Sequence, residues 1–390
     1  MHSTRALNPK PSASKRFRQA PSGLLLPLHA TLRGRARWQV LDERGVPEVP
    51  RTRSGFAIGP AEGVEQPNLI TDLGLDRIVE QDVLETNLSN SITAGRMWRR
   101  RLAVGTGSTA PDVTDTTLDA EVERDATSGT FSAGSAVAEL DTGDNVWRAT
   151  VLVTRLVTMT ADRNLTEWGF AQNTSGDIVI RELFRDDVGD PVTISLLDGK
   201  SIKLDHTLTI ELPAPAAGNT ATIGLDEYDA GNNLVASTPY DIVHGGVASS
   251  LTSGNILGSQ WTTGGGVFLA WNPYGTGGAS LTRIAVAKTY APSPASGLST
   301  DFEPSDSTST KIASFTNEAY TSGNHELVRR ATFPTGAGNA AWYGFGATAS
   351  YSSEQYRREG WWVLFDSPAT YTKASTDTLR VGLKSTWARA

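Results

Sequence analysis

Two groups of carboxylates contain the residue types that could bind a cation or catalyse hydrolysis. One group lies within residues 112–123 and the other within residues 186–190, where Gly189 indicates a loop. Glycoside hydrolysis requires two carboxyl groups that face each other across a cleft, and proximity in sequence does not establish that arrangement. Neither group has the spacing of an EF-hand loop. We therefore expect solvated loops, with calcium binding by residues 186–190 and catalysis as the alternatives.

Other reactive residue types are sparse. The chain contains no cysteine, which excludes disulfides, thiol nucleophiles and thiolate metal sites. Its five histidines lack metal-ligand spacing, and no serine occupies a nucleophile elbow. The segment from Gly105 to Gly107 lacks the lysine of a phosphate-binding loop, so we expect a plain turn there. No apolar run is long enough to span a membrane. These observations predict a protein that is not an enzyme and needs no cofactor or metal.

Positive charge is concentrated at the N-terminal end. The chain has a net charge of −7, but residues 1–53 hold eleven basic and three acidic side chains. That segment therefore has a net charge of +8, and the remaining residues sum to −15. Such basic groups could meet a partner's carboxylates or nucleic-acid phosphates, and the absence of a nucleic-acid-binding motif favours a protein partner. The residues expected to dock are Lys10, Lys15, Arg16, Arg18, Arg33, Arg35, Arg37, Arg99, Arg100 and Arg101.

The elements that would position these residues are strands. Residues 1–22 are rich in Ser, Pro, Lys and Arg without an apolar period, and we expect an extended basic arm over 1–27. Within residues 31–40 apolar and small side chains alternate with arginines, which predicts a half-buried strand with a basic outer face. Many further short strands are separated by turn residues, which is typical of β-sandwiches. One short helix is expected over residues 68–80.

The two halves of the chain resemble each other. Five segments match in the same order, which chance similarity between alternating β sequences would explain less well than a duplication. The fold class predicted is therefore all-β, with two tandem, duplicated β-sandwich domains over residues 28–213 and 214–390. The matches join 102–107 to 284–289, 148–150 to 330–332, 168–170 to 343–345, 184–191 to 365–368, and 207–212 to 378–383.

Trp361 and Trp362 form an adjacent pair in a predicted strand. Neighbouring strand residues point to opposite faces, so one ring would pack in the core and the other would face outward. The outward ring could contact a glycan or a protein partner. A core position with an exposed edge is the alternative.

Several motifs resemble those of accessory virion proteins from tailed bacteriophages. Residues 68–76 read NLITDLGLD, which is similar to the NLIT-x-x-GLD segment of that family. The next strand ends in VGTG at residues 104–107, and TDTTL follows at residues 114–118. The LTEWGF and RELF segments, at 165–170 and 181–184, also fit. The resemblance covers residues 30–212 and extends weakly over 214–390, where no NLIT segment is recognisable.

This resemblance implies a structural component of a virion that assembles in the host cytoplasm. The expected station is the neck or collar, the tail, or the attachment of a fibre. Partners would be portal, neck, tail or capsid proteins, and the chain would be homo-oligomeric in the particle. A head decoration or cement protein and a carbohydrate-binding module for host adsorption are the alternatives, with a depolymerase as a third. The motifs are structural and bring no catalytic residue with them.

Overall fold

The computed structural model is an all-β protein, as predicted. It describes residues 23–80, 98–125, 132–133, 137–141, 146–172, 175–213, 220–229, 233–243, 281–287, 312–314, 316–335, 341–342, 344–349, 360–364, 371–372, 376 and 378–390. Sixteen strands of this part of the chain belong to one sheet, and a five-stranded sheet packs beside it. The described residues contain one short helix, α1 (Asp72–Asp76), which continues into the 3-10 turn η1 (Arg77–Val79). None of their helices is long and apolar enough to cross a membrane.

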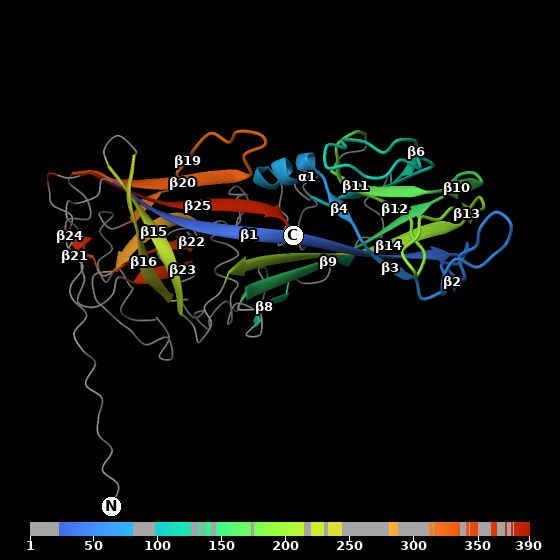
Figure 1. The fold of residues 1–390 in the computed structure, drawn as a ribbon, viewed down its shortest axis with the longest axis horizontal. Helices are drawn as coiled ribbons and strands as arrows, with labels where there is room; N and C mark the ends of the chain where they lie inside the picture. Colours follow the sequence, from blue (N-terminus) through green and yellow to red (C-terminus); the bar gives the residue numbers. More distant parts are fainter. Residues whose placement is uncertain are drawn as a thin grey trace, which may run out of the picture.

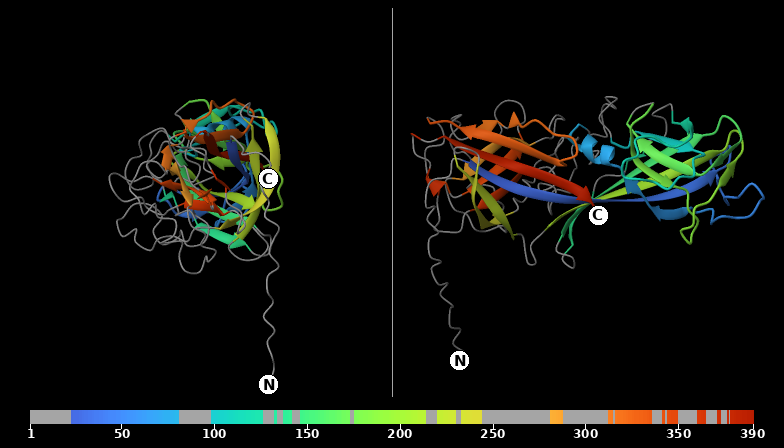
Figure 2. Two further views of the ribbon diagram at one scale, coloured as in Figure 1. Left: turned by 90° about the vertical axis from the view of Figure 1, so that its left-hand side faces the viewer. Right: turned by 45° about the horizontal axis from the view of Figure 1, so that its top comes forward.

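The molecule is elongated, with two β lobes arranged end to end (Figures 1 and 2). The first lobe contains the strands from β2 to β14, and the second lobe contains those from β15 to β25. Strand β1 (Gly23–Leu41) runs through both lobes, as its blue ribbon shows in Figure 1. One hydrophobic cluster includes Trp38 of the first lobe and Phe333 of the second, so the apolar core is continuous between them.

Strand β1 changes its partners along its length. Its second half pairs antiparallel with β14 (Ser201–Pro213) and with β3 (Val64–Pro67). Its first half pairs antiparallel with β15 (Thr220–Tyr228) and parallel with β25 (Leu379–Arg389). The second half follows the predicted alternation: Leu32, Ala36, Trp38 and Val40 are buried, whereas Arg33, Arg35 and Arg37 are exposed.

The first lobe is a two-layer sandwich. Strands β1, β14 and β9 form one layer, and the second layer has the strand order β4-β12-β11-β5-β6. Fully buried aromatic side chains, including Trp38, Trp98 and Trp168, fill the space between them. The remaining strands of this lobe are β2 (Pro47–Glu48), β4 (Leu69–Ile70), β5 (Arg101–Gly105), β6 (Glu121–Arg124), β7 (Ser132–Ala133), β8 (Val137–Asp141), β9 (Val146–Thr158), β10 (Arg163–Leu165), β11 (Glu167–Ala171), β12 (Ile178–Leu183) and β13 (Ile194–Leu196).

The second lobe repeats part of this connectivity. In the first lobe β5 pairs with β11 and β11 with β12; in the second lobe β17 pairs with β22 and β22 with β23. The strands of the second lobe, other than β15 and β25, are β16 (Leu234–Val243), β17 (Leu281–Ala287), β18 (Ile312–Ser314), β19 (Thr316–Asn317), β20 (Glu326–Phe333), β21 (Ala341–Trp342), β22 (Gly344–Ala349), β23 (Gly360–Leu364) and β24 (Tyr371–Thr372).

One strand pair also repeats in register. Ala149 of β9 lies opposite Ile210 of β14, and Ala331 of β20 lies opposite Val381 of β25. The sequence matches place Ala149 with Ala331 and Ile210 with Val381, so the same partners are opposed in both lobes. This agreement favours the duplication, which stays a prediction. The junction at residues 214–219 lies outside the described part of the chain.

Two predicted boundaries differ from the structure. The arm was expected over residues 1–27, but residues 23–27 belong to β1 because they form backbone pairs with β25. Residues 1–22, with Lys10, Lys15, Arg16 and Arg18, lie outside the described residues. The predicted helix over 68–80 is also too long, because Leu69 and Ile70 pair with β12 and the side chain of Thr71 caps α1.

Candidate functional site

The NLIT segment is folded around a helix start. The Oγ1 atom of Thr71 accepts a hydrogen bond from the Gly74 amide at 3.0 Å and donates to the carbonyl of Ile178 at 3.0 Å. This N-cap fixes α1 against β12. A Cβ atom on Gly74 would lie 2.2 Å from the carbonyl oxygen of Val179, so only glycine allows this close approach. The motif therefore requires its threonine and glycine for local packing.

The same segment joins the two lobes, and we call these contacts the interlobe joint. The indole N–H of Trp387 in β25 donates to the carbonyl of Leu75 at 2.9 Å. Arg389 donates to the carbonyl of Ile70 at 2.5 Å and forms an ion pair with Asp72. The end of the last strand is thus bonded directly to α1 and to the residues that precede it.

Asp76 completes the interlobe joint from the other end of α1. Its carboxylate accepts hydrogen bonds from the Tyr320 hydroxyl at 2.6 Å, the Gly323 amide at 2.8 Å and the Ser322 hydroxyl. Burial alone would raise the pKa of Asp76, but these hydrogen bonds outweigh it and hold the pKa below its usual value. The Tyr320 ring stacks on Trp387 with centroids 6.0 Å apart.

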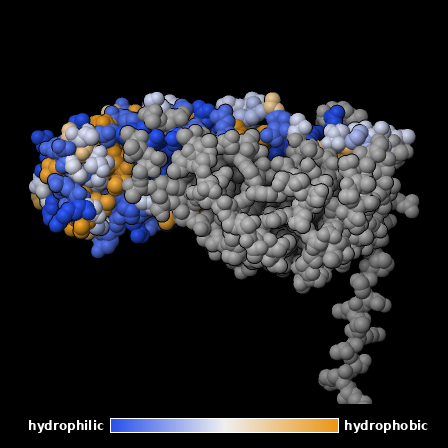
Figure 3. Space-filling view, turned by 180° about the vertical axis from the view of Figure 1, so that it is seen from behind, coloured by the Kyte–Doolittle hydropathy of each residue, from blue (hydrophilic) through white to orange (hydrophobic). Residues whose placement is uncertain are grey.

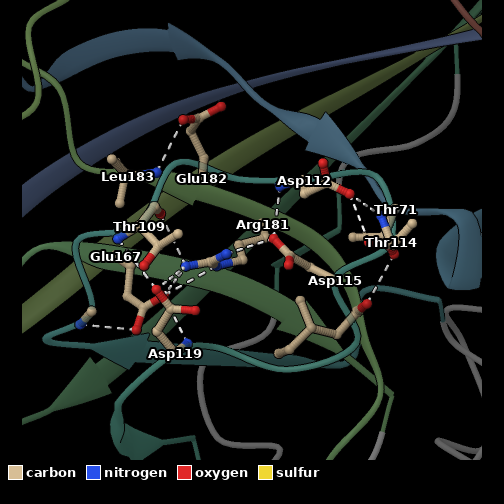
Figure 4. Close-up of polar contacts among 12 residues, drawn as sticks. Thr71, Thr109, Asp112, Thr114, Asp115, Asp119, Glu167, Arg181, Glu182 and Leu183 are labelled. Carbon is tan, nitrogen blue, oxygen red and sulfur yellow. Dashed lines mark hydrogen bonds and ion pairs between the residues drawn. The ribbon is translucent and has the colours of Figure 1, made fainter.

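A second polar network lies inside the first lobe, around Arg181 and Glu167 (Figure 4). Both side chains are buried, and the guanidinium donates to Glu167 at 2.9 and 3.1 Å. Arg181 also contacts Asp115 at 2.5 Å and Asp119 at 3.0 Å, and donates to the carbonyl of Thr109 at 3.1 Å. The loop acids Asp115 and Asp119, which we expected to be solvated, are therefore bound by a buried cation.

These contacts determine the charge states in the network. Burial opposes the charged form of Arg181, but its bonds to Asp115 and Glu167 outweigh burial and raise the pKa of the guanidinium. A hydrogen bond from Thr109 and the charge of Arg181 lower the pKa of Asp119. Arg181 and Asp119 are consequently held in their charged forms, and the single guanidinium is shared by three carboxyl groups.

The GTG segment and residues 119–120 together surround the Glu167 carboxylate. The backbone amides of Gly107 and Ala120 donate to Glu167 Oε1 at 3.0 and 2.8 Å, and the Asp119 amide donates to Oε2 at 3.2 Å. A Cβ atom on Gly105 or Gly107 would lie 2.5 or 2.4 Å from Oε1. The expected plain turn is thus an anion-binding loop occupied by a side chain of the same protein.

Gly107→Ala is expected to destabilise the protein by about 1–3 kcal/mol, because the new methyl group overlaps Glu167 and the Cβ of Asp119. Urea unfolding would measure the change. The exposed neighbour Ser108 provides the control, and Ser108→Ala should change stability by less than about 0.5 kcal/mol. Equal effects of the two substitutions would contradict this account of the motif.

The predicted docking arginines at 99–101 are not a surface cluster. Arg99 is fully buried, and its NH1 group contacts His206 Nδ1 at 2.6 Å and the His206 carbonyl at 3.0 Å. Arg101 is also buried and donates to the carbonyl of Asp125, while Arg100 is half-buried. The expectation that Arg99 and Arg101 face a partner is therefore wrong, because they turn inward to bond with backbone carbonyls.

The contact with Arg99 also assigns the tautomer of His206. A guanidinium can only donate, so Nδ1 accepts and Nε2 carries the proton, which it donates to Asn68 Oδ1 at 3.0 Å. Burial and the charge of Arg99 lower the pKa of His206 well below 6.5. His206 is therefore neutral in the folded protein and connects the NLIT segment to β14.

His206 should make the protein less stable in mild acid. Below pH 6.5 the unfolded chain protonates this histidine while the folded protein does not. Its contribution is therefore complete above pH 6.5, and the free energy of unfolding falls by up to about 1.4 kcal/mol per pH unit below it. Urea titrations between pH 7.5 and 5.5 would measure the slope. His206→Gln should flatten it and His29→Gln, at an exposed site, should not; an unchanged slope in His206→Gln would contradict the assignment.

The other predicted contact residues divide into two groups. Arg33, Arg35 and Arg37 are exposed on β1, and Arg35 and Arg37 share Glu65 as an ion-pair partner at 3.4 and 3.6 Å. Trp361 and Trp362 lie in β23, opposite Ala347 and Gly346, and their side chains are outside the described part of the protein. Asp186 accepts hydrogen bonds from the amides of Val188 and Asp190, so it stabilises its own loop. Among the described residues, no group of three or more potential ligands is placed to hold a metal ion.

Exposed apolar side chains gather on loops at the free end of the first lobe. In this lobe the most exposed are Val188 and Phe56, at 78% and 73%, followed by Leu197 and Val46, while Leu234 of the second lobe is 56% exposed. Figure 3 shows hydrophobic residues among hydrophilic ones on this lobe, at its left. Apolar side chains scattered among polar ones are ordinary on a protein surface, so these residues by themselves indicate no partner.

Comparison of the chain with protein-family models, curated proteins and solved structures gave no match. The sequence interpretation found the segments that form both networks but missed the roles of Glu167, Arg181 and His206. The sequence did contain one signal of these roles, which is a charged residue at an inward-facing position of a predicted strand. Such a residue is buried only when it is paired, so it indicates a partner inside the protein.

Proposed function

We propose that this protein is a non-enzymatic structural component of a tailed-phage virion, at the neck, collar, tail or fibre attachment. The observation that carries the proposal is the shared strand β1 together with the interlobe joint, which unite two β lobes in one elongated body. A body of this shape suits a bridge between neighbouring proteins. The resemblance of residues 30–212 to accessory virion proteins supplies the biological setting.

The motifs behind that resemblance support a structural role. Thr71 and Asp76 of the NLIT segment are bonded to backbone or side-chain groups of the same chain. Glu167 and Arg181 bond to each other and to the loop around them. Side chains in these bonds hold the fold together, which is the role of motif residues in a scaffold protein.

The basic regions would contact partners at two separate places on the protein. Residues 1–22 precede Gly23, which pairs with Tyr228 and Arg380 in the second lobe. The arginine face lies in the first lobe, and the thirteen residues from Gly23 to Arg35 extend over about 40 Å of strand. Partners such as portal, neck, tail or capsid proteins could therefore be contacted at both ends, with further copies of the chain beside them.

Binding to particles assembled without this protein would test the proposal. We expect the full chain to co-sediment with them, and a variant lacking residues 1–22 to lose at least tenfold in affinity. Arg33→Gln/Arg35→Gln/Arg37→Gln should weaken binding separately, whereas Arg44→Gln, at an exposed turn, serves as the control. A full chain that stays in the supernatant would contradict the virion role. Binding to tail-less capsids alone would favour the head-decoration alternative.

A further inference from the structure

The first half of β1 lies between two strands of the second lobe. Residues from Gly23 to Leu25 pair with β15 on one side, and residues from Gly23 to Leu32 pair with β25 on the other. Strands β15 and β25 do not pair with each other in the described structure. Among the described strands, β1 is therefore the connection between β15 and β25 in the sheet of the second lobe.

The direction of this strand distinguishes it from its surroundings. The β1–β25 ladder is parallel, whereas the other ladders of the described strands are antiparallel. In the first lobe, β1 pairs directly with β14 from Thr31 to Leu41. The sequence matches make β25 the counterpart of β14, and β15 is the first strand of the second lobe, as β1 is of the first. The pairing equivalent to β1–β14 would then be β15–β25, and β1 lies between these two strands.

The packing around the strand is adapted to it. Leu25, Leu28 and Ala30 are buried, as expected for an inner strand rather than a peripheral one. Leu25 lies opposite Gly382, where a Cβ atom would approach Leu25 Cδ1 to 3.0 Å and the carbonyl oxygen of Arg329 to 2.5 Å. Glycine at this position leaves the space that the Leu25 side chain occupies.

We propose that the second lobe contains a binding site for an extended peptide between β15 and β25, and that residues 23–32 of the same chain occupy it. The ligand class is a strand with alternating apolar side chains, added parallel to β25 through backbone hydrogen bonds. The second lobe is then completed only by the N-terminal strand, which carries the basic arm. This inference does not depend on the proposed function.

A disulfide between opposed positions tests the occupant directly. His29 and Thr386 are opposite each other, with Nδ1 and Oγ1 2.8 Å apart, and the chain has no cysteine of its own. His29→Cys/Thr386→Cys should form a disulfide within one chain under mild oxidation. In the control His29→Cys/Lys384→Cys the positions are two residues out of register, too far apart for a bridge. A covalent dimer, no disulfide, or equal bridging by the control would overturn the proposal.

Peptide binding tests the site itself. A fluorescent peptide of residues 23–30 should bind saturably to a chain lacking residues 1–30, and at least tenfold more weakly to a chain lacking only residues 1–22, whose site is filled. A peptide with Leu28→Arg should not bind. Equal binding to both chains, or no binding to a folded chain without residues 1–30, would overturn the proposal. If that chain does not fold, the disulfide experiment decides. If the protein failed to bind phage particles, the proposed function would be wrong, but the expected results of the disulfide and peptide experiments would not change.

Discussion

Arg181→Met is expected to lower the free energy of unfolding by about 3–5 kcal/mol. The substitution removes the cation that Glu167, Asp115 and Asp119 share, and it leaves the Glu167 carboxylate buried without a charged partner. The methionine fills much of the same volume, so the loss measures charge compensation more than packing. Urea unfolding followed by tryptophan fluorescence would measure it, since Trp168 is adjacent to Glu167 in β11.

A surface arginine provides the control for this prediction. Arg35 contacts Glu65 at 3.4 Å, but its side chain is 64% exposed, so Arg35→Met should cost less than about 1 kcal/mol. Arg181→Lys keeps the charge but loses the fork that reaches several carboxylates, and its effect should be intermediate. A loss from Arg181→Met no larger than that from Arg35→Met would show that the network does not stabilise the first lobe.

Trp387→Ala is expected to cost about 3–5 kcal/mol and to uncouple the two lobes. The substitution removes a buried ring that stacks on Tyr320, together with the indole N–H that donates to Leu75. Because these contacts join β25 to α1, the cavity would weaken the interlobe joint itself. We expect the native protein to unfold in one transition in urea and the Trp387→Ala variant to unfold in two.

Tyr320→Phe isolates one bond of the same joint. It removes the hydroxyl that donates to Asp76 but keeps the ring on Trp387, so the loss should be about 1 kcal/mol with one transition preserved. Hydrogen exchange in β25 and α1 would locate the effect of each variant. A Trp387→Ala protein that unfolds in one transition, within 1 kcal/mol of the native chain, would contradict the role given to the joint.

Local pattern was enough to predict the fold class and the face of the first strand. The alternation from Leu32 to Val40 requires one buried and one exposed side, and the structure confirms both. The residues Asp-Glu-Arg-Gly at 42–45 are also typical of a turn, and in the structure the Gly45 amide closes that turn on Asp42 with a φ of 78° at the glycine. These features depend on residues close together in the chain.

The networks could not be predicted, because their partners are distant in sequence. Glu167 accepts a hydrogen bond from the Gly107 amide, 60 residues away in the sequence, and Arg99 contacts His206, 107 residues away. A run of arginines has the same appearance whether it faces water or turns toward carbonyl groups. Only the packing of β5 against its neighbours decided that Arg99 and Arg101 are inside.

By itself, the sequence determined an all-β chain with a basic N-terminal end and an arginine face on its first strand. These features follow from the hydrophobic period and the charges of residues that are contiguous in the chain. The tertiary structure alone decided that this strand serves both lobes. Strand periodicity specifies which side chains are buried but not which backbone lies alongside. That choice depends on β15 and β25, about 200 and 350 residues further along the chain.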